Sequence, residues 1–273
     1  MTPDFSLAHL TAPSLPPPEV IAVASRAGYR YVGLRLIGAT PDVAAWPLFS
    51  DKAMMRETRA RLAATGLGVL DIEFFRLTPE TDVASFRPAL EAGAELGARH
   101  VIAAAYDPER ARLIERFAAL CDLAGSSGLG VVLEFFPWTD APNLSSAAAV
   151  VAAAGRANAG VLVDTLHFTR SDSTLEQLDR LPASRLPYLH LCDAPAEKPD
   201  TIDGLIFTAR VERLLPGDGG IDIAAIMRHM PANIPVALEI PMTALTRAVG
   251  PAEVARRARE AAARALAPLA SAR

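Results

Sequence analysis

The sequence predicts a (β/α)8 TIM barrel, an α/β fold with a single domain over residues 1–273. Three observations support this prediction. Short apolar runs alternate with longer Ala-, Arg- and Glu-rich stretches of helical period. The length of 273 residues suits one large α/β domain, and no long Gly/Ser linker divides the chain. Strands that alternate with helices run parallel, and eight such units at this length favour closure into a barrel.

The expected strands are runs rich in Val, Ile, Leu and Phe. They cover residues 5–10, 31–36, 68–75, 100–105, 130–136, 160–165, 188–193 and 236–241. The main alternative is an open, doubly wound sheet, which usually has a Gly-rich loop after its first strand. The stretch TAPSLPPPE at that place has no glycine, so the barrel is favoured.

Most expected helices begin with Ser, Asp or Pro, residues that satisfy or tolerate a helix N-terminus. They start near Pro17, Asp51, Asp82, Asp107, Ser145, Ser173, Asp222 and Pro251. Several end at a glycine that leads into the next strand, as is typical of helix C-termini. These glycines are Gly28, Gly66, Gly97 and Gly128. One long irregular connection is expected at residues 194–221.

Composition limits the partners. Hydrophobic residues make up 51% and charged residues 21% of the chain, and the net charge of −4 argues against a nucleic-acid or membrane partner. Cys121 and Cys192 lie in apolar segments, which indicates buried free thiols and a reducing compartment. The first residues lack signal-peptide features and no apolar run is long enough to span a bilayer, so we expect a cytoplasmic protein. The Ala-rich segment 251–271 packs either on the barrel or on a neighbour, which leaves a homo-oligomer open.

Two apolar strands carry a similarly placed carboxylate, Glu134 in VVLEFFPW and Glu239 in VALEIP. A carboxylate on a buried strand is costly unless it is paired. The strands between them end with Asp164 in VLVDTLH and His190 in YLHLCD. In a barrel, chemistry occurs where the strands end, so four successive strands each supply one metal-capable side chain.

Each of these side chains alone is best explained as a loop ion pair or a hydrogen-bonded core histidine. Together they would place three negative charges in a low dielectric, and a divalent cation resolves that repulsion. Three carboxylates and one imidazole favour Mn²⁺, with Mg²⁺, Co²⁺ or Zn²⁺ as alternatives. Asp193 either orients His190 or forms a loop ion pair.

The stretches LEFFPW, VLVDTLHF, YLHLCDAP, RLLPGDGGID and VALEIP resemble the sugar phosphate isomerase/epimerase family with a xylose-isomerase-like barrel, over essentially the full length. The resemblance implies a metal quartet formed by Glu134, Asp164, His190 and Glu239. It also implies functional roles for His167 and for Arg213, which precedes a Pro-Gly turn. Family members include ketose epimerases, inosose isomerases and dehydratases, hydroxypyruvate isomerase and 3-dehydroshikimate dehydratases, so the substrate stays open.

A metal bound to a ketone oxygen and a neighbouring hydroxyl acidifies the carbon between them and stabilises the enediolate. Glu134 and Glu239 face each other across part of the mouth, as a two-face proton exchange requires. We therefore expect an isomerase or epimerase that acts on a ketose or related polyol ketone. The alternative is a dehydratase of 3-dehydroshikimate or an inosose, because the same enediolate can expel a β-hydroxyl.

Other polar residues near the strand ends are candidate substrate contacts. His167 either binds a substrate hydroxyl or shuttles a proton, or else it caps the following helix. Arg213 or its competitor Arg210 would bind a carboxylate, phosphate or hydroxyl, unless Arg213 pairs with Glu212 or Asp218.

The early strands add three further candidates, His9, Arg35 and Glu73. Alternation places Asp71 on the same face as Glu73, so the two are expected to share a polar niche. An apolar wall for a carbon skeleton is expected from Phe136, Trp138 and Phe168.

Two other classes of protein fit the sequence less well. A nuclease of the related abasic-site type needs a larger histidine cluster, and the chain has five histidines and a net charge of −4. A catalytically silent binding barrel would not need the intact quartet.

Overall fold

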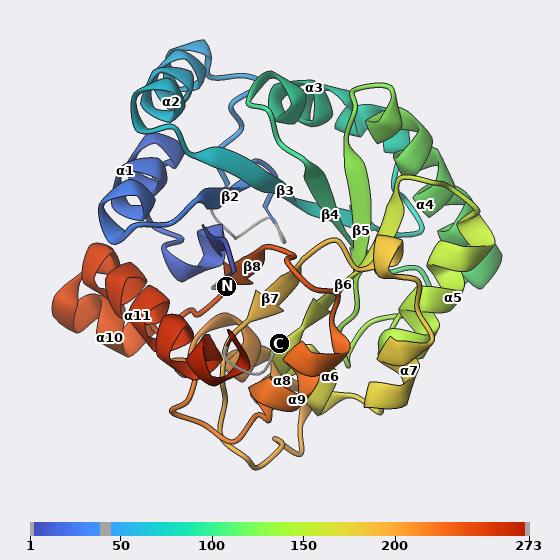
Figure 1. Cartoon of the computed structure of the whole chain (residues 1–273). Coiled ribbons are helices and arrows are strands. Elements are labelled where there is room, and N and C mark those ends of the chain that lie inside the picture. The colour runs from blue at the N-terminus through green and yellow to red at the C-terminus, as the bar shows by residue number, and fades with distance from the viewer. Residues whose placement is uncertain (1–2, 39–44, 271–273) are drawn as a thin grey trace.

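The structure is a computed structural model that describes residues 3–38 and 45–270. Figure 1 shows strands around a central axis with helices outside them, and all neighbouring strands pair in parallel, so the predicted TIM barrel is confirmed. The strands are β1 (Phe5–Leu7), β2 (Tyr31–Arg35), β3 (Gly68–Leu77), β4 (His100–Ala105), β5 (Gly130–Glu134), β6 (Ala159–Asp164), β7 (Leu189–Leu191) and β8 (Val236–Leu238). The first and last strands close the barrel through the register Ser6 to Ala237.

The helices cover the outside of the barrel. They are α1 (Pro17–Ala27), α2 (Lys52–Thr65), α3 (Arg87–Glu95), α4 (Arg110–Gly125), α5 (Leu144–Ala154), α6 (Thr165–Arg170), α7 (Leu175–Asp179), α8 (Ile202–Arg210), α9 (Ile223–His229), α10 (Thr243–Val249) and α11 (Pro251–Ala270). Asp51 and Asp222 cap helices with their side chains, and Gly28 and Gly66 end helices at positive φ, as the sequence predicts.

The prediction was wrong in part for the connection after β7. Residues 194–221 contain helix α8, which starts after Thr201, whose hydroxyl accepts the N–H of Gly204. Helix α10 was not expected from the sequence either. Both elements follow strands whose carboxyl ends carry candidate ligands, and α8 contributes Ala209 and Arg210 to the wall of the cavity at the barrel mouth.

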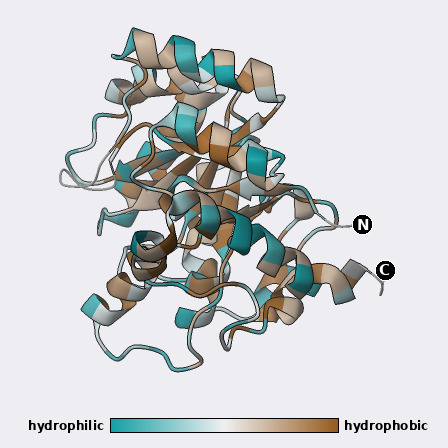
Figure 2. Ribbon diagram, turned by 90° about the vertical axis from the view of Figure 1, so that its left-hand side faces the viewer, coloured by the Kyte–Doolittle hydropathy of each residue, from teal (hydrophilic) through white to brown (hydrophobic). Residues whose placement is uncertain are grey.

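Most of the core lies between the strands and the helices. Figure 2 shows apolar colouring on the central strands and a mixture of hydrophilic and apolar colours along the outer helices. The C-terminal helix α11 buries Val254, Ala258 and Ala262 completely and packs against α1 and α9, so its apolar face covers the barrel. Among the described residues, no helix combines the length and the apolar character needed to cross a bilayer.

Inside the barrel, side chains stack in levels. The strands of an eight-stranded barrel are tilted, so residues at one height come from alternate strands. Counting along the register, one buried level consists of Ser6, Asp71, Val132 and Tyr188. The next level towards the carboxyl ends of the strands consists of Gly33, Ile102, Leu162 and Ala237. The levels above these carry the candidate functional residues.

Candidate metal centre

Each predicted metal ligand lies at or next to the carboxyl end of one of the last four strands. Glu134 and Asp164 are the final residues of β5 and β6, His190 lies within β7, and Glu239 directly follows β8. All four are buried, with at most 5% of any of them exposed. The parallel register of these strands therefore brings together residues that are far apart in the sequence.

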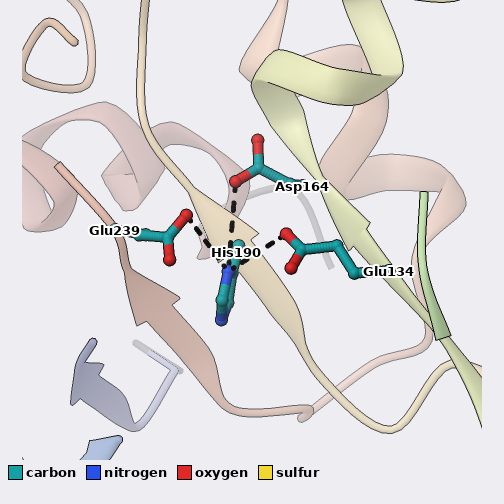
Figure 3. A group of neighbouring side chains, drawn as sticks. All are labelled: Glu134, Asp164, His190 and Glu239. Carbon is teal, nitrogen blue, oxygen red and sulfur yellow. Dashed lines mark ion pairs between the residues drawn. The ribbon is translucent and has the colours of Figure 1, made fainter. Parts of the chain in front are cut away.

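The four side chains point towards one another (Figure 3). Nδ1 of His190 lies 3.6 Å from a carboxylate oxygen of Glu134, 3.6 Å from one of Glu239 and 3.9 Å from one of Asp164. One potential ligand atom from each residue lies within 4.8 Å of the others. Asp164 also accepts the main-chain N–H groups of Leu166 and His167 through its other oxygen, which fixes its carboxylate.

These positions fit a divalent cation. Two ligand atoms that are each about 2.1 Å from a cation lie about 3.0–3.4 Å apart at octahedral or tetrahedral angles. The observed separations of 3.6–3.9 Å exceed this by a few tenths of an ångström and are too long for ordinary hydrogen bonds. Nδ1 of His190 and one Glu134 oxygen are buried without a hydrogen-bond partner among the described residues. A cation between them would satisfy both atoms.

Arg213 holds the other side of the cluster. Its guanidinium donates to Asp164 at 2.6 Å and to Glu239 at 2.7 Å, and its Nε–H donates to the carbonyl of Ala209. The suggested ion pairs of Arg213 with Glu212 or Asp218 were therefore wrong. Only 1% of Arg213 is exposed, so this residue positions two candidate ligands and balances part of their charge.

The electrostatic environment separates the two glutamates. Burial raises the pKa of Glu134 to about 8, against the opposing effect of the nearby His190. Burial also acts to raise the pKa of Glu239, but Arg213 and His190 outweigh it and leave that pKa below its usual range. These directions describe the protein groups alone, and a bound cation would lower the pKa of both carboxyls.

A cavity of about 240 Å³ opens above the cluster. Its apolar wall includes Phe74, Phe136 and Trp138, of which Phe136 and Trp138 were expected. Phe168 is buried in the core outside the cavity lining, so its expected place in the wall was wrong. Phe74 was missed because a register shift between Ile72 and Phe75 breaks the two-residue alternation of β3.

His167 lies against this aromatic wall. Its ring centroid is 4.5 Å from that of Phe136 and 5.4 Å from that of Trp138. The ring lines the cavity, and neither of its nitrogens has a hydrogen-bond partner among the described residues. Burial lowers its pKa to about 4, so the ring is neutral at pH 7.

Other predicted contact residues differ in their surroundings. Arg35 and Glu73 form a buried ion pair at 2.8 Å, and both line the cavity together with Arg210. His9 does not line it. Nδ1 of His9 accepts the main-chain N–H of Arg35 and Nε2 donates to the carbonyl of Leu15, so both nitrogens are satisfied by the backbone.

Asp71 and Asp193 are polar residues close to these ligands in sequence or in space. Asp71 faces the barrel interior like Glu73, but it lies at a lower level, and burial raises its pKa well above the usual value. Both alternatives for Asp193 were wrong. Its carboxylate accepts the main-chain N–H groups of Ala194, Gly217, Gly219 and Ile221, and so it organises the turn that follows Arg213.

Fold and site define a (β/α)8 barrel with a candidate metal centre at the carboxyl ends of its last four strands. Residues 21–266 match the family model of the xylose isomerase-like TIM barrel, so the chain belongs to this family. The resemblance drawn from the sequence motifs is thereby confirmed.

Named relatives have several activities. The chain is 26% identical over 220 residues to an inosose isomerase of Bacillus velezensis, which covers 75% of each protein. It is 27% identical over 136 residues to a 3-dehydroshikimate dehydratase of Pseudomonas aeruginosa, which covers 48% of this chain and 21% of the relative. Relatives of this chain are thus isomerases and dehydratases.

Solved structures with the same fold include the protein IolI with a bound zinc atom. Its TM-score is 0.80 at 18% identity, with 97% of this chain and 98% of that chain covered. A D-allulose 3-epimerase of Methylomonas sp. in complex with D-allulose has a TM-score of 0.69 at 17% identity, with 95% and 96% covered. At these identities the likeness establishes the fold alone.

Proposed function

We propose that this protein is a divalent-metal-dependent isomerase or epimerase that acts on a ketose or related polyol ketone through an enediolate. The observation that carries the proposal is the convergence of Glu134, Asp164, His190 and Glu239 below a cavity with an aromatic wall. These four residues would hold the ion, for which Mn²⁺ is our first choice, with Mg²⁺, Co²⁺ or Zn²⁺ as alternatives. When bound, a divalent ion polarises the substrate ketone and acidifies the adjacent carbon.

The proton transfers fall to Glu134 and Glu239. Their strands are separated by β6 and β7 around the barrel, so the two carboxyl groups reach the cavity from different sides. In an epimerase, one of these two groups removes the substrate α-proton and the other returns a proton on the opposite face.

The remaining cavity residues would bind and orient the substrate. The neutral ring of His167 can donate to or accept from a hydroxyl group above the metal ligands. Trp138 and Phe136 offer an apolar face to the carbon skeleton, and the Arg35–Glu73 pair offers both a donor and an acceptor. His9 would act indirectly, because it holds the main chain of Arg35.

A dehydratase of a keto acid is the second candidate, and one observation favours it. Arg210 lines the cavity but forms no ion pair with any other residue in the described ranges, whereas Arg35 and Arg213 are each paired with carboxylates. An unpaired guanidinium is suited to a substrate carboxylate. The partial match to a 3-dehydroshikimate dehydratase supports the same candidate.

Solvent proton exchange tests the first proposal. Purified protein loaded with Mn²⁺ is incubated in D₂O with a panel of ketoses and inososes, and NMR follows the loss of the substrate α-proton. Exchange that depends on the metal supports the proposal, and its absence across the panel contradicts it.

New ultraviolet absorbance with 3-dehydroshikimate or an inosose would identify the dehydratase instead. An Arg210→Gln variant should weaken binding of the acid more than binding of the inosose.

We also propose a cytoplasmic location for this protein. Both cysteines, Cys121 and Cys192, are free and buried, which is consistent with the predicted cytoplasmic location. We propose a small polyol or keto acid as the only class of partner beyond the metal, with a homo-oligomer left open.

A further inference from the structure

A group of unpaired polar atoms lies inside the barrel below the metal ligands, with the Gly33 level between them. Ser6 Oγ, Asp71 Oδ2 and the Tyr188 hydroxyl are buried, and none has a hydrogen-bond partner within the ranges that the structure describes. All three belong to the level that also contains Val132. Unpaired buried polar groups are costly, so three of them at one level call for an explanation.

The level above these residues has small side chains on one side. It contains Gly33 and Ala237 towards β1, and the larger Ile102 and Leu162 on the opposite side. A Cβ atom on Gly33 would lie only 2.5 Å from Asp71 Oδ1, so the Asp71 carboxyl group extends into the space that a side chain at Gly33 would fill. This glycine lets Asp71 approach the level of the metal ligands.

His190 lies between the metal ligands and this group of unpaired polar atoms. Its Nδ1 faces the three carboxylates, while its Nε2 is buried and also lacks a hydrogen-bond partner among the described residues. Its ring centroid lies 5.8 Å from that of Tyr188, which precedes it by two residues on the same inner face. A neutral histidine that binds a metal through Nδ1 carries its proton on Nε2, and such histidines almost always donate that proton to a carboxylate, a carbonyl or water.

We propose that Ser6, Asp71, Tyr188 and Nε2 of His190 line a water-binding chamber, in which a bound water accepts the Nε2 proton of His190 and donates to the Asp71 carboxyl group. A buried water usually makes about three hydrogen bonds, and this chamber offers four polar partners. Asp71 is then a positioning residue, which fixes His190 with Nδ1 free for the metal. The inference rests on the proposed function only in taking the four-residue metal site as given.

Zinc affinity tests the chamber without any substrate. Metal-stripped native protein, Asp71→Leu and Tyr188→Phe are titrated with Zn²⁺ by calorimetry. Loss of an outer partner of a metal-binding histidine typically raises the metal Kd about 10–100-fold, and we expect this from both variants. Ile102→Val is the matched control, because it alters packing inside the barrel on a strand with no candidate ligand. It should change the Kd less than about twofold.

Two further variants separate hydrogen bonding from packing. Asp71→Asn keeps a carbonyl acceptor and should stay within about tenfold of native affinity, below the range expected when the outer partner is lost. Gly33→Ala leaves every polar group in place but displaces the Asp71 carboxyl group, and should weaken zinc binding as Asp71→Leu does. If Asp71→Leu fails to fold, the zinc affinities of Tyr188→Phe and Gly33→Ala still test the chamber.

The tautomer of His190 gives a readout that packing alone does not move. Nitrogen-15 spectra of zinc-loaded native protein should show His190 protonated at Nε2 and bound through Nδ1, and a high-resolution crystal structure should place a water within hydrogen-bond distance of Nε2 and Asp71. Native zinc binding with unchanged affinity in Tyr188→Phe and Gly33→Ala would overturn the chamber alone. Absence of zinc, manganese and cobalt binding by the native protein would overturn the metal centre and the chamber together.

Discussion

Two of the buried carboxylate sites near the carboxyl ends of the strands, Asp107 and the metal quartet, are built differently. Asp107 follows β4 and has both oxygens bonded, to Arg112 at 2.7 Å and 2.6 Å, to Arg116 at 2.9 Å and to the N–H of Glu109 at 3.0 Å. The cluster at the ends of β5–β8 keeps one Glu134 oxygen and both nitrogens of His190 unpaired among the described residues.

The difference between these groups separates a structural ion pair from a functional site. Around Asp107, every charge meets a partner within the chain, and the bond from Arg112 holds the pKa of this carboxyl below its usual range. Around His190, the separations between polar atoms suit a bound cation. A chain tolerates such an incomplete network only where a ligand or a function completes it.

The largest expected effect is on proton exchange. Glu239→Gln keeps the size of the side chain and removes the carboxylate, so the exchange rate of the active panel substrate should fall about 10³-fold, within the range for loss of a general base. The rate is measured by NMR in D₂O at saturating Mn²⁺. Asp107→Asn, the control, should retain the native rate within about twofold. If both variants lost the exchange activity to a similar extent, Glu239 and Asp107 would not differ in function, which would contradict the comparison.

Metal binding should stabilise the fold through the quartet alone. At a metal concentration 100 times the Kd, the free energy of unfolding should rise by about 2.7 kcal/mol. Asp107→Asn should show the same increment, while Glu239→Gln and His190→Ala should lose most of it. Urea unfolding with and without Mn²⁺ measures the increment. An equal increment in His190→Ala would place the cation elsewhere.

Loss of the Asp107 network should cost stability instead. Asp107→Asn removes the charge of a buried group that accepts four hydrogen bonds from three residues, and we expect a loss of about 2 kcal/mol. The folded-state pKa of Asp107 is lowered, so its contribution is present above the unfolded pKa of about 4 and is lost as the pH falls through the folded value. Native stability should therefore fall more steeply below pH 4 than that of Asp107→Asn, as acid titrations of unfolding would show.

The metal quartet was predictable because a closed parallel barrel aligns the ends of its strands. Given eight strands in order, Glu134, Asp164, His190 and Glu239 had to lie around one side of the mouth, and the register brings them together. The inward direction of Asp71 and Glu73 followed from alternation in the same way. These features depend on the alternation of side chains along a strand and on the order of the strands. Both can be read directly from the sequence.

Features that depend on irregular backbone were not predictable. The register shift in β3 turns Phe74 towards the cavity, and the alternation of apolar and polar residues does not predict this shift. Three of the four partners of Asp193 are N–H groups 24 to 28 residues away, brought together by a turn. The clustered glycines at 217–220 were the one available signal, since a Cβ on Gly219 would lie 2.4 Å from Asp193 Oδ1.

The smallest expected effect concerns two buried histidines. One of them lacks hydrogen-bond partners among the described residues and the other is fully hydrogen-bonded, as with the metal quartet and Asp107. His167 has no partner for either ring nitrogen among the described residues, whereas both nitrogens of His9 are bonded to the backbone. His167→Phe removes an unsatisfied polar ring beside Phe136 and Trp138, so stability should stay unchanged or rise by up to about 1 kcal/mol.

His9→Phe should instead destabilise the protein by about 2 kcal/mol, because it leaves the N–H of Arg35 and the carbonyl of Leu15 unpaired. Urea unfolding of the two variants side by side measures the contrast. If His167 contacts substrate as proposed, the more stable variant should also be the less active one. A large loss of stability in His167→Phe would mean that its ring supports the fold, and the cavity would then lose one of its proposed functional groups.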